Sequence, residues 1–232
     1  MQHTIAHGPA YAMATLELAP RESVTVEAGS MVGMSDGLKI RTHIGGNKGG
    51  FFSGIVNFLL ALVRKFLGGE TLFVNTYSPP DDQAGRILVA PALSGDIRHY
   101  ALDGTRRLMV QGASYLASTD GVTVKTKFGG LKSLFSGEGA FWLVCSGQGE
   151  LWINCYGAIH EIEVAGTYIV DTGHVVAFDD TLDYKIKGSG GLKSTLLSGE
   201  GLTMHFSGSG RLFIQTRNLD GMIHWLSPRL HG

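Results

Sequence analysis

The sequence is short of charge, and it shows no segment that would send the chain across a membrane. Charged residues make up 17% of the 232 residues and the formal net charge is −1. No overall field would therefore attract nucleic acid or anionic lipid, and no DNA partner is expected. The N-terminal MQHTIAHGPAY lacks both a cationic start and an apolar run, so no secretory signal is predicted and a cytoplasmic location is expected.

Cysteine is scarce, and the two cysteines are predicted to stay free. Cys145 and Cys155 fall on opposite strands of one predicted hairpin whose turn is SGQG (146–149). In that register the two sulfurs do not face each other, so no disulfide is expected. Two free thiols indicate a reducing compartment.

Proline is also scarce, whereas glycine is abundant: the chain has 6 prolines and 34 glycines. The glycines separate apolar runs, which is typical of many tight turns between short strands and not of disorder. A chain of this length can bury a large core. The sequence therefore predicts a single all-β domain over residues 1–232.

The chain repeats itself three times. Each stretch has an apolar strand, a small-residue turn, a second apolar strand, an aspartate, an alternating strand with lysine, and Gly-Gly. The stretches are TVEAGSMVGMSDGLKIRTHIGG (25–46), LMVQGASYLASTDGVTVKTKFGG (108–130) and YIVDTGHVVAFDDTLDYKIKGSGG (168–191). Each is followed by Gly-Glu and a predicted hairpin. Such periodicity indicates pseudo-repeats, placed here at about 7–84, 85–148 and 149–209.

The phase of the repeats predicts a closed body. The second and third repeats each begin with the strand that follows a hairpin turn, whereas the first repeat lacks this strand. The chain ends with a spare one, GRLFIQT, at about 210–217. We expect this last strand to complete the first repeat in a closed β-sandwich, which would also remove exposed sheet edges.

The first repeat carries an insertion, FFSGIVNFLLALVRKFLGG (51–69), whose spacing predicts an apolar helix over 51–67. Seventeen residues span about 25 Å, which is short of the roughly 20 apolar residues that cross a bilayer. Burial in the core or against another subunit is favoured, and contact with a membrane surface is the alternative. The residues predicted to make a membrane or subunit contact are Phe51, Phe52, Ile55, Phe58, Leu59, Leu62, Val63 and Phe66.

The weak candidates for a metal site are Glu70, Glu138 and Glu200, which follow a glycine in every repeat. Three carboxylates around one axis could hold a divalent cation. The favoured interpretation is that each glutamate binds backbone N–H groups of its glycine-rich corner. Asp36, Asp120 and Asp180 are similarly interpreted as turn residues.

No nucleophile elbow, phosphate-binding loop or zinc-type spacing of His and Cys occurs, so neither an enzyme nor a cofactor is predicted.

The phrases LVRKFLGGETLFVNTY (62–77), the two SGEG corners and LFIQTRN (212–218) resemble the family named for altered inheritance of mitochondria, a mitochondrial-biogenesis family with many bacterial members. The resemblance implies a body like that of the trp RNA-binding attenuation protein, described as a double-stranded β-helix, and a membrane-linked scaffold role. It supplies no catalytic residue. Because the chain lacks a mitochondrial targeting peptide, a bacterial, cytoplasmic protein is expected.

The function predicted from the sequence is a non-enzymatic scaffold or binding protein. It would act through homo-oligomerisation or through peripheral membrane association of 51–67. The alternative is a small-ligand or metal-binding protein that uses the Gly-Glu corners. RNA binding is disfavoured because the chain has no excess of basic residues, and because likeness of fold does not carry function.

Overall fold

The computed structural model describes residues 1–44, 72–127, 142–188 and 202–230. These residues form a mostly β structure with large antiparallel sheets and one α-helix, which confirms the all-β prediction. The strands are β1 (Gln2–Ala6), β2 (Met13–Leu18), β3 (Val24–Glu27), β4 (Met31–Met34), β5 (Lys39–Ile44), β6 (Phe73–Ser78), β7 (Gly85–Val89), β8 (Ile97–Asp103), β9 (Leu108–Gln111), β10 (Tyr115–Thr119), β11 (Val122–Lys127), β12 (Trp142–Asn154), β13 (Ile159–Asp171), β14 (Val175–Asp179), β15 (Leu182–Gly188) and β16 (Leu202–Gln215). Two 3₁₀ turns, η1 (Gly112–Ser114) and η2 (Thr172–His174), precede β10 and β14, and α4 (Leu219–Leu230) follows β16.

One pairing scheme recurs along the chain. The strands form three groups, each with two three-stranded ladders, and each group is called a sheet pair below. In the first sheet pair, β7 lies between β2 and β4, and β6 lies between β3 and β5. In the second, residues 148–154 of β12 pair with β8 and β10, and residues 142–147 pair with β9 and β11. In the third, residues 209–215 of β16 pair with the first half of β13 and with β14, and residues 202–208 pair with the second half of β13 and with β15.

The register skips one residue at the same place in each sheet pair. The skip lies between Met31 and Gly33 on β4, between Tyr115 and Ala117 on β10, and between Val175 and Ala177 on β14. A bulge of this kind bends the strand and turns the extra side chain out of the ladder. Val32, Leu116 and Val176 are the three residues so placed.

Neighbouring sheet pairs are joined strand to strand. β10 of the second pair adds to β3 of the first, and β14 of the third adds to β9 of the second. The cores follow these junctions: Leu116 packs into the core around Val24 and Val26, and Val176 packs into the core around Val110. Each junction therefore places side chains of one sheet pair in the core of the preceding one.

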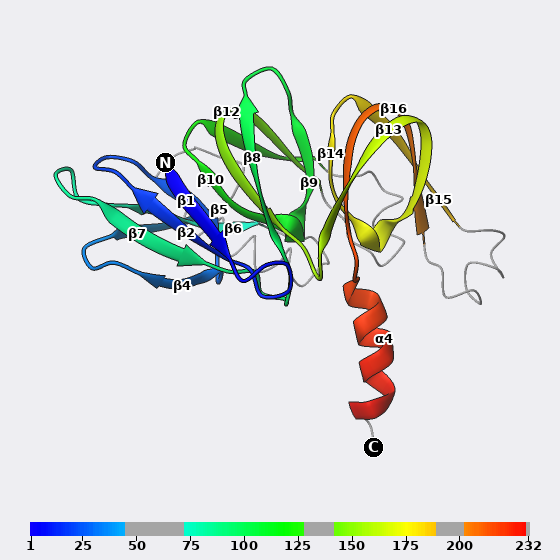
Figure 1. The fold of residues 1–232 in the computed structure, drawn as a ribbon, viewed down its shortest axis with the longest axis horizontal. Helices are drawn as coiled ribbons and strands as arrows, with labels where there is room; N and C mark the ends of the chain where they lie inside the picture. The colour runs from blue at the N-terminus through cyan, green and yellow to red at the C-terminus, as the bar shows by residue number, and fades with distance from the viewer. Residues whose placement is uncertain (45–71, 128–141, 189–201, 231–232) are drawn as a thin grey trace.

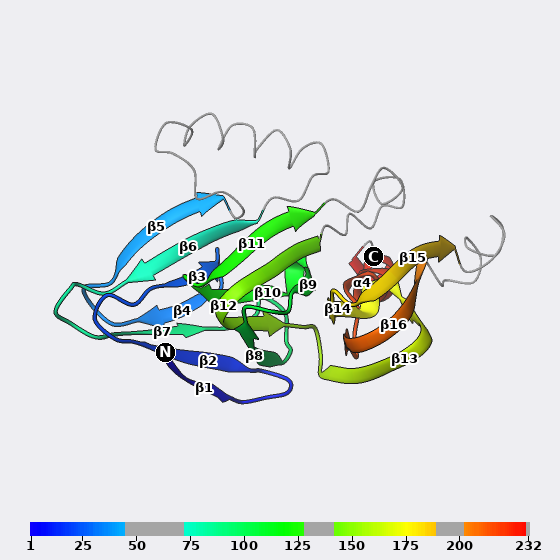
Figure 2. The ribbon, with the colours of Figure 1, turned by 90° about the horizontal axis from the view of Figure 1, so that it is seen from above.

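All three hairpins predicted after the Gly-Glu corners are wrong. In the first, β6 and β7 flank the loop at 79–84 but pair with other strands and not with each other. The other two were predicted around SGQG (146–149) and SGSG (207–210). Residues 142–154 and 202–215 are each one continuous strand that bends and changes partners at its middle (Figures 1 and 2). Gly147 and Gly208 lie at these bends with φ of +105° and +118°, a conformation that favours glycine. Cys145 and Cys155 are free, as predicted. They do not face each other across a hairpin: Cys145 lies on β12 and Cys155 directly follows the end of the same strand.

The predicted closure is also wrong. Residues 209–215 pair with β13 and β14, and no described residue of the first sheet pair contacts them in a ladder. The reason is that this segment continues β16 directly, without a loop that could carry it to the other end of the molecule. The described sheets stay open: the 4-stranded sheet ends at β1 and β4, and the path of the 12-stranded sheet ends at β13 and β5. The first sheet pair lies at the left of Figures 1 and 2 and the third lies at the right.

Candidate functional site

The residues singled out from the sequence as site candidates lie outside the described part of the chain. This holds for Glu70, Glu138 and Glu200, and for every predicted contact residue of the 51–67 segment. Among the described residues, no group of three or more His, Cys, Asp or Glu side chains is placed to hold a metal ion. No helix in the described ranges is both long enough and apolar enough to span a bilayer.

Two of the three turn aspartates join neighbouring sheet pairs instead of serving only their own turns. Asp120 accepts a hydrogen bond of 2.5 Å from the Ser23 hydroxyl, and Asp180 binds the Arg107 guanidinium at 2.6 Å. Ser23 and Arg107 occupy the same place, directly before β3 and β9. Asp36 binds the backbone N–H of Gly37 at 2.9 Å, which fits the turn prediction.

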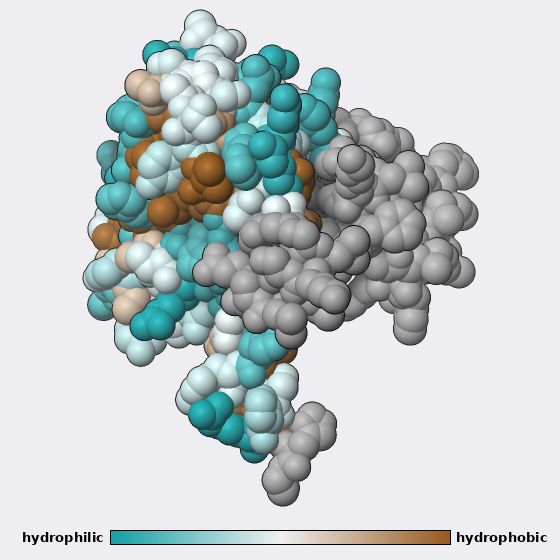
Figure 3. All heavy atoms as spheres, turned by 90° about the vertical axis from the view of Figure 1, so that its right-hand side faces the viewer, coloured by the Kyte–Doolittle hydropathy of each residue, from teal (hydrophilic) through white to brown (hydrophobic). Residues whose placement is uncertain are grey.

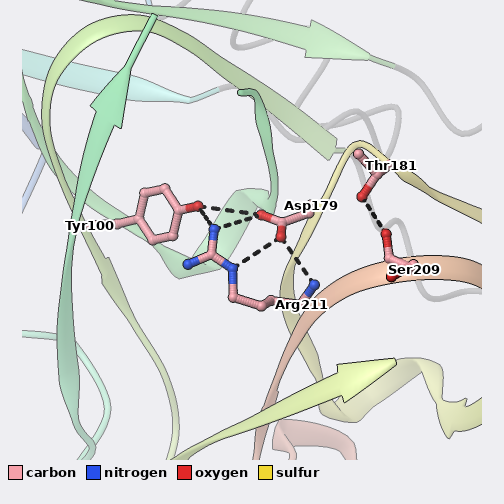
Figure 4. Close-up of polar contacts among 5 residues, drawn as sticks. All are labelled: Tyr100, Asp179, Thr181, Ser209 and Arg211. Atoms are coloured by element: carbon pink, nitrogen blue, oxygen red, sulfur yellow. Dashed lines mark hydrogen bonds and ion pairs between the residues drawn. The ribbon is translucent and has the colours of Figure 1, made fainter. Parts of the chain in front are cut away.

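A polar cluster stands at the junction of the second and third sheet pairs (Figure 4). The buried Asp179 on β14 accepts hydrogen bonds from the backbone N–H and the Nε of Arg211 on β16, both at 3.0 Å. Tyr100 on β8 donates to Asp179 at 3.3 Å and also contacts the Arg211 guanidinium. Burial and the nearby Asp179 carboxylate raise the pKa of Tyr100. The cluster ties three strands together and pairs the Asp179 carboxylate with the Arg211 guanidinium.

The backbone part of this cluster is repeated. The Ser35 hydroxyl accepts from the N–H of Arg86, and the Thr119 hydroxyl accepts from the N–H of Glu150, both at 2.9 Å. Each hydroxyl lies at the end of its strand and accepts a hydrogen bond from the residue that follows a glycine on the neighbouring strand. Only the third sheet pair uses a carboxylate here, which is why it also holds an arginine side chain.

Beside the junction lies a cleft of about 500 Å³. Its walls combine apolar and charged side chains, namely Arg107, Met109, Lys127, Val144, Phe178, Asp180, Leu182, Asp183 and Tyr184. Phe178 packs edge-on against Tyr184, with ring centroids 5.3 Å apart. Because Asp180 is already paired with Arg107, Lys127 and Asp183 are the charged groups left to select a ligand by charge.

Two histidines form a second polar group, between β1 and β8. The rings of His3 and His99 lie 4.1 Å apart, and both lie near the buried ring of Trp152. His99 contacts the Glu150 carboxylate. Burial, and then the neighbouring His99, lower the pKa of His3. The ring contact of His3 with His99 joins β1 to β8.

The two ends of the described sheet system expose apolar side chains. Of the twelve large apolar residues that are exposed in the described ranges, five lie on β4 and on the second half of β13: Met31, Val32, Met34, Tyr168 and Ile169. Val32 is 59% exposed and Ile169 is 55% exposed. Figure 3 faces the end formed by the third sheet pair and shows a hydrophobic area among hydrophilic side chains. These two strand edges are the candidate functional surface.

Sequence reasoning did not find this surface. The apolar residues of β4 and β13 belong to ordinary strand patterns, and their exposure depends on which edges stay unpaired. A signal that could have found it is the position of MVGM (31–34) in its repeat, which matches YLAST (115–119) and VVAFD (175–179). Three strands at matching positions are expected either all to pair with a further strand or all to lack such a partner.

Comparison with known proteins gives consistent matches. The model of the family described as Mitochondrial biogenesis AIM24 matches residues 3–217. The chain is 30% identical over 223 residues to the uncharacterized protein M6_Spy0233 of Streptococcus pyogenes serotype M6, across 95% of this chain and 87% of that protein. The crystal structure of protein SPYM3_0169 from Streptococcus pyogenes is similar with a TM-score of 0.79 at 26% identity, across 98% of this chain and 99% of that one.

Proposed function

The chain belongs to the Mitochondrial biogenesis AIM24 family, and from that premise we propose that it is a non-enzymatic scaffold that assembles with further copies of itself. The observation that carries the proposal is the apolar exposure of the two strand edges on β4 and β13. Unpaired, apolar sheet edges invite pairing with another chain, and proteins normally cover or blunt them. An assembly of copies would cover both edges.

The state of the buried carboxylate and of the two thiols in the described residues supports the non-enzymatic part of the proposal. The buried carboxylate Asp179 is neutralised by Arg211, and both described cysteines are buried, with burial raising the pKa of Cys145 to about 12 and of Cys155 to about 11. A thiol with so high a pKa is a poor nucleophile near neutral pH. Neither group is activated for catalysis.

The mass of the protein in solution tests this proposal. Sedimentation velocity over a range of chain concentrations should show species that are multiples of the 24.8 kDa chain. A single-chain mass at every concentration, including those above the cellular level, would contradict self-assembly. The scaffold would then have to act through another protein.

The finer features of the scaffold are part of the same proposal. We propose a three-repeat body, with a likeness to the trp RNA-binding attenuation protein, in the cytoplasm of a bacterium. The 51–67 segment would supply a peripheral membrane contact. Vesicle co-flotation tests that contact, with the Phe58→Asp/Leu62→Asp double variant as the comparison. Flotation of the wild type alone would support it, and a wild type that stays in the soluble fraction would contradict it.

A small-ligand function is the second candidate, and the cleft beside Phe178 favours it. Its volume of about 500 Å³ lies within the range of ligand pockets, and its mixture of apolar and charged lining residues suits a small amphipathic molecule. Thermal-shift screening of such molecules tests this candidate, with Phe178→Ala as the variant in which any stabilisation should disappear.

A further inference from the structure

We infer that the exposed edges of β4 and of the second half of β13 bind each other between copies, head to tail, in the register that already joins the sheet pairs within one chain. The inference rests on the proposed self-assembly and assigns its contact. The edge of β4 is the head, and Tyr168–Asp171 of β13 is the tail. The partner is therefore a second copy of this chain, presenting the opposite end.

The register follows from the two internal junctions. On the first, Ala117 lies opposite Val26 and Thr119 lies opposite Val24. On the second, Ala177 lies opposite Val110 and Asp179 lies opposite Leu108. Both junctions are antiparallel and start at the residue that follows the bulge.

The third instance of this register has no partner inside the chain. Gly33 follows the bulge on β4, as Ala117 and Ala177 do on their strands. Tyr168 on β13 lies opposite Phe206, as Val24 lies opposite Tyr77 and Leu108 opposite Cys145 in the equivalent ladders. The same register therefore places Gly33 opposite Val170, Met34 opposite Ile169 and Ser35 opposite Tyr168, between two copies.

Burial of the bulge residue gives an independent argument. Leu116 and Val176 are both 0% exposed because each enters the core of the preceding sheet pair, whereas Val32 is 59% exposed. In the proposed contact Val32 enters the core of the third sheet pair of the next copy, among Val170 and Phe206. Burying this apolar side chain favours the contact, because it removes apolar surface from water.

Leu88 on β7, next to the head, is also less buried than the residues at the matching positions of the other sheet pairs. Trp152 and Phe213 lie opposite Ala117 and Ala177, the residues that follow the bulge. Each is buried in the core of the preceding sheet pair. Leu88 holds the equivalent position, opposite Gly33 on β7, and it is only half-buried. The contact between copies would complete its burial.

The polar contacts of the junctions also have a third counterpart. Asp120 binds Ser23 and Asp180 binds Arg107, each across a junction. The residue that matches Ser23 and Arg107 is Thr167, directly before the tail, and the residue that matches the two aspartates is Asp36. Both are exposed in the single chain. In the proposed contact the Thr167 hydroxyl of one copy donates to the Asp36 carboxylate of the next.

The two edges cannot meet within one chain, because they lie in sheet pairs at opposite ends of the long axis of the molecule (Figures 1 and 2). A contact between unlike surfaces of identical chains is heterologous, so it produces a ring if the rotation closes and a filament if it does not. The apolar residues on α4 offer a competing contact, which the experiment below separates from this one.

A complementation experiment with two folded variants tests the inference. Val32→Asp blocks the head and Ile169→Asp blocks the tail, and both positions are more than half exposed, so neither change disturbs the core of the single chain. Tyr11→Asp, at a residue 74% exposed and away from both edges, is the matched control, and Leu230→Asp, 67% exposed, tests α4. Circular dichroism verifies folding, and sedimentation velocity gives the mass.

The expected result is that the wild type and Tyr11→Asp form the same assembly, while Val32→Asp and Ile169→Asp each sediment as single chains. An equimolar mixture of these two variants should form a two-chain species, because one intact head meets one intact tail. If the wild type assembles but the edge variants keep its mass, or the mixture stays monomeric, the inference is overturned while self-assembly stands. Loss of mass in Leu230→Asp alone likewise overturns it in favour of α4. A monomeric wild type overturns both.

A charge pair across the contact tests the register itself. In the two-chain species, Thr167→Arg in the chain that supplies the tail should lower the dissociation constant about 3-fold, because it reproduces the Arg107–Asp180 pair. Asp36→Asn in the other chain should cancel this gain. A gain that survives Asp36→Asn would show that the register is wrong.

Discussion

The Asp179 carboxylate on β14 accepts three hydrogen bonds from Arg211 on β16: from its backbone N–H and its Nε, each at 3.0 Å, and from its Nη2 at 3.2 Å. The same arginine lies over the Tyr100 ring, with its Cζ 4.8 Å from the ring centroid. Tyr100 belongs to the second sheet pair and Arg211 to the third. Their contact therefore holds these two neighbouring sheet pairs together. The first sheet pair offers a matched position, Arg86, whose guanidinium is largely exposed.

We expect Arg211→Leu to lower the free energy of unfolding by about 2–3 kcal/mol, because a buried carboxylate loses its charged partner. Arg86→Leu should lower it by less than about 1 kcal/mol, since its ion pair with Glu17 is exposed. Urea unfolding followed by circular dichroism measures both. Equal losses in the two variants would mean that burial of Asp179 does not set the cost.

Glu27 gives a pH dependence of stability. Burial raises its pKa from 4.5 to about 7, against the opposing hydrogen bond from Ser30. The folded protein therefore holds this proton more tightly than the unfolded chain. The resulting stabilisation is complete below about pH 4.5 and is lost as the pH rises through about 7. Across this window the stability of the wild type, measured against Glu27→Gln, should fall by up to about 3 kcal/mol.

Urea unfolding of the wild type and Glu27→Gln at a series of pH values makes this comparison, and Glu22→Gln serves as a control at a partly exposed carboxylate of the same region. A difference between wild type and Glu27→Gln that stays constant with pH would show that Glu27 titrates normally.

Gly95 packs directly against the backbone of Cys155. A Cβ atom at this position would overlap the carbonyl oxygen of Cys155, which is a backbone atom that cannot turn away. We expect Gly95→Ala to destabilise the protein by about 3 kcal/mol or more. Gly33→Ala is the matched control, because a Cβ there meets no atom within 4 Å. Measured in the Val32→Asp background, its midpoint of thermal unfolding should stay unchanged or rise slightly, and a loss like that of Gly95→Ala would contradict the argument.

The two thiols should react only when the protein opens. With burial raising the pKa of Cys145 to about 12 and of Cys155 to about 11, few thiolates exist near pH 8. A colorimetric disulfide reagent should therefore modify neither thiol in the native protein within minutes, and both at once in urea. Fast reaction of one thiol in the native protein would show that its strand opens locally.

The repeated alternation of apolar strands and glycines was enough to predict a mostly β chain, and the residues of the family resemblance were enough to identify the family. The hairpins were mispredicted because a Ser-Gly-x-Gly sequence suits both a turn and a bent strand. Which of them forms depends on the partners: β8 and the first half of β13 pair with the residues after the bend, and no local signal places them there.

The candidate surface was not predicted, for a related reason. Ser23 and Asp120 are 97 positions apart, so their contact follows from the way the sheet pairs add to one another and not from spacing. The helix α4 also falls outside the predictions, because Gly221 and Pro228 lie within it and weaken a helical pattern. The Gly-Glu corners and the 51–67 helix remain predictions, since they lie outside the described residues.

The bent strands have a mechanical consequence. In the second and third sheet pairs one unbroken backbone, β12 or β16, belongs to both sheets, so a pull on one sheet is carried to the other through covalent bonds. In the first sheet pair β6 and β7 are separate strands joined by the loop at 79–84, which can give way before either sheet does. The protein therefore has a compliant end, the first sheet pair, and a stiff end, the third. A head-to-tail filament of such molecules would stretch at the first sheet pair of each copy, at regular intervals along its length.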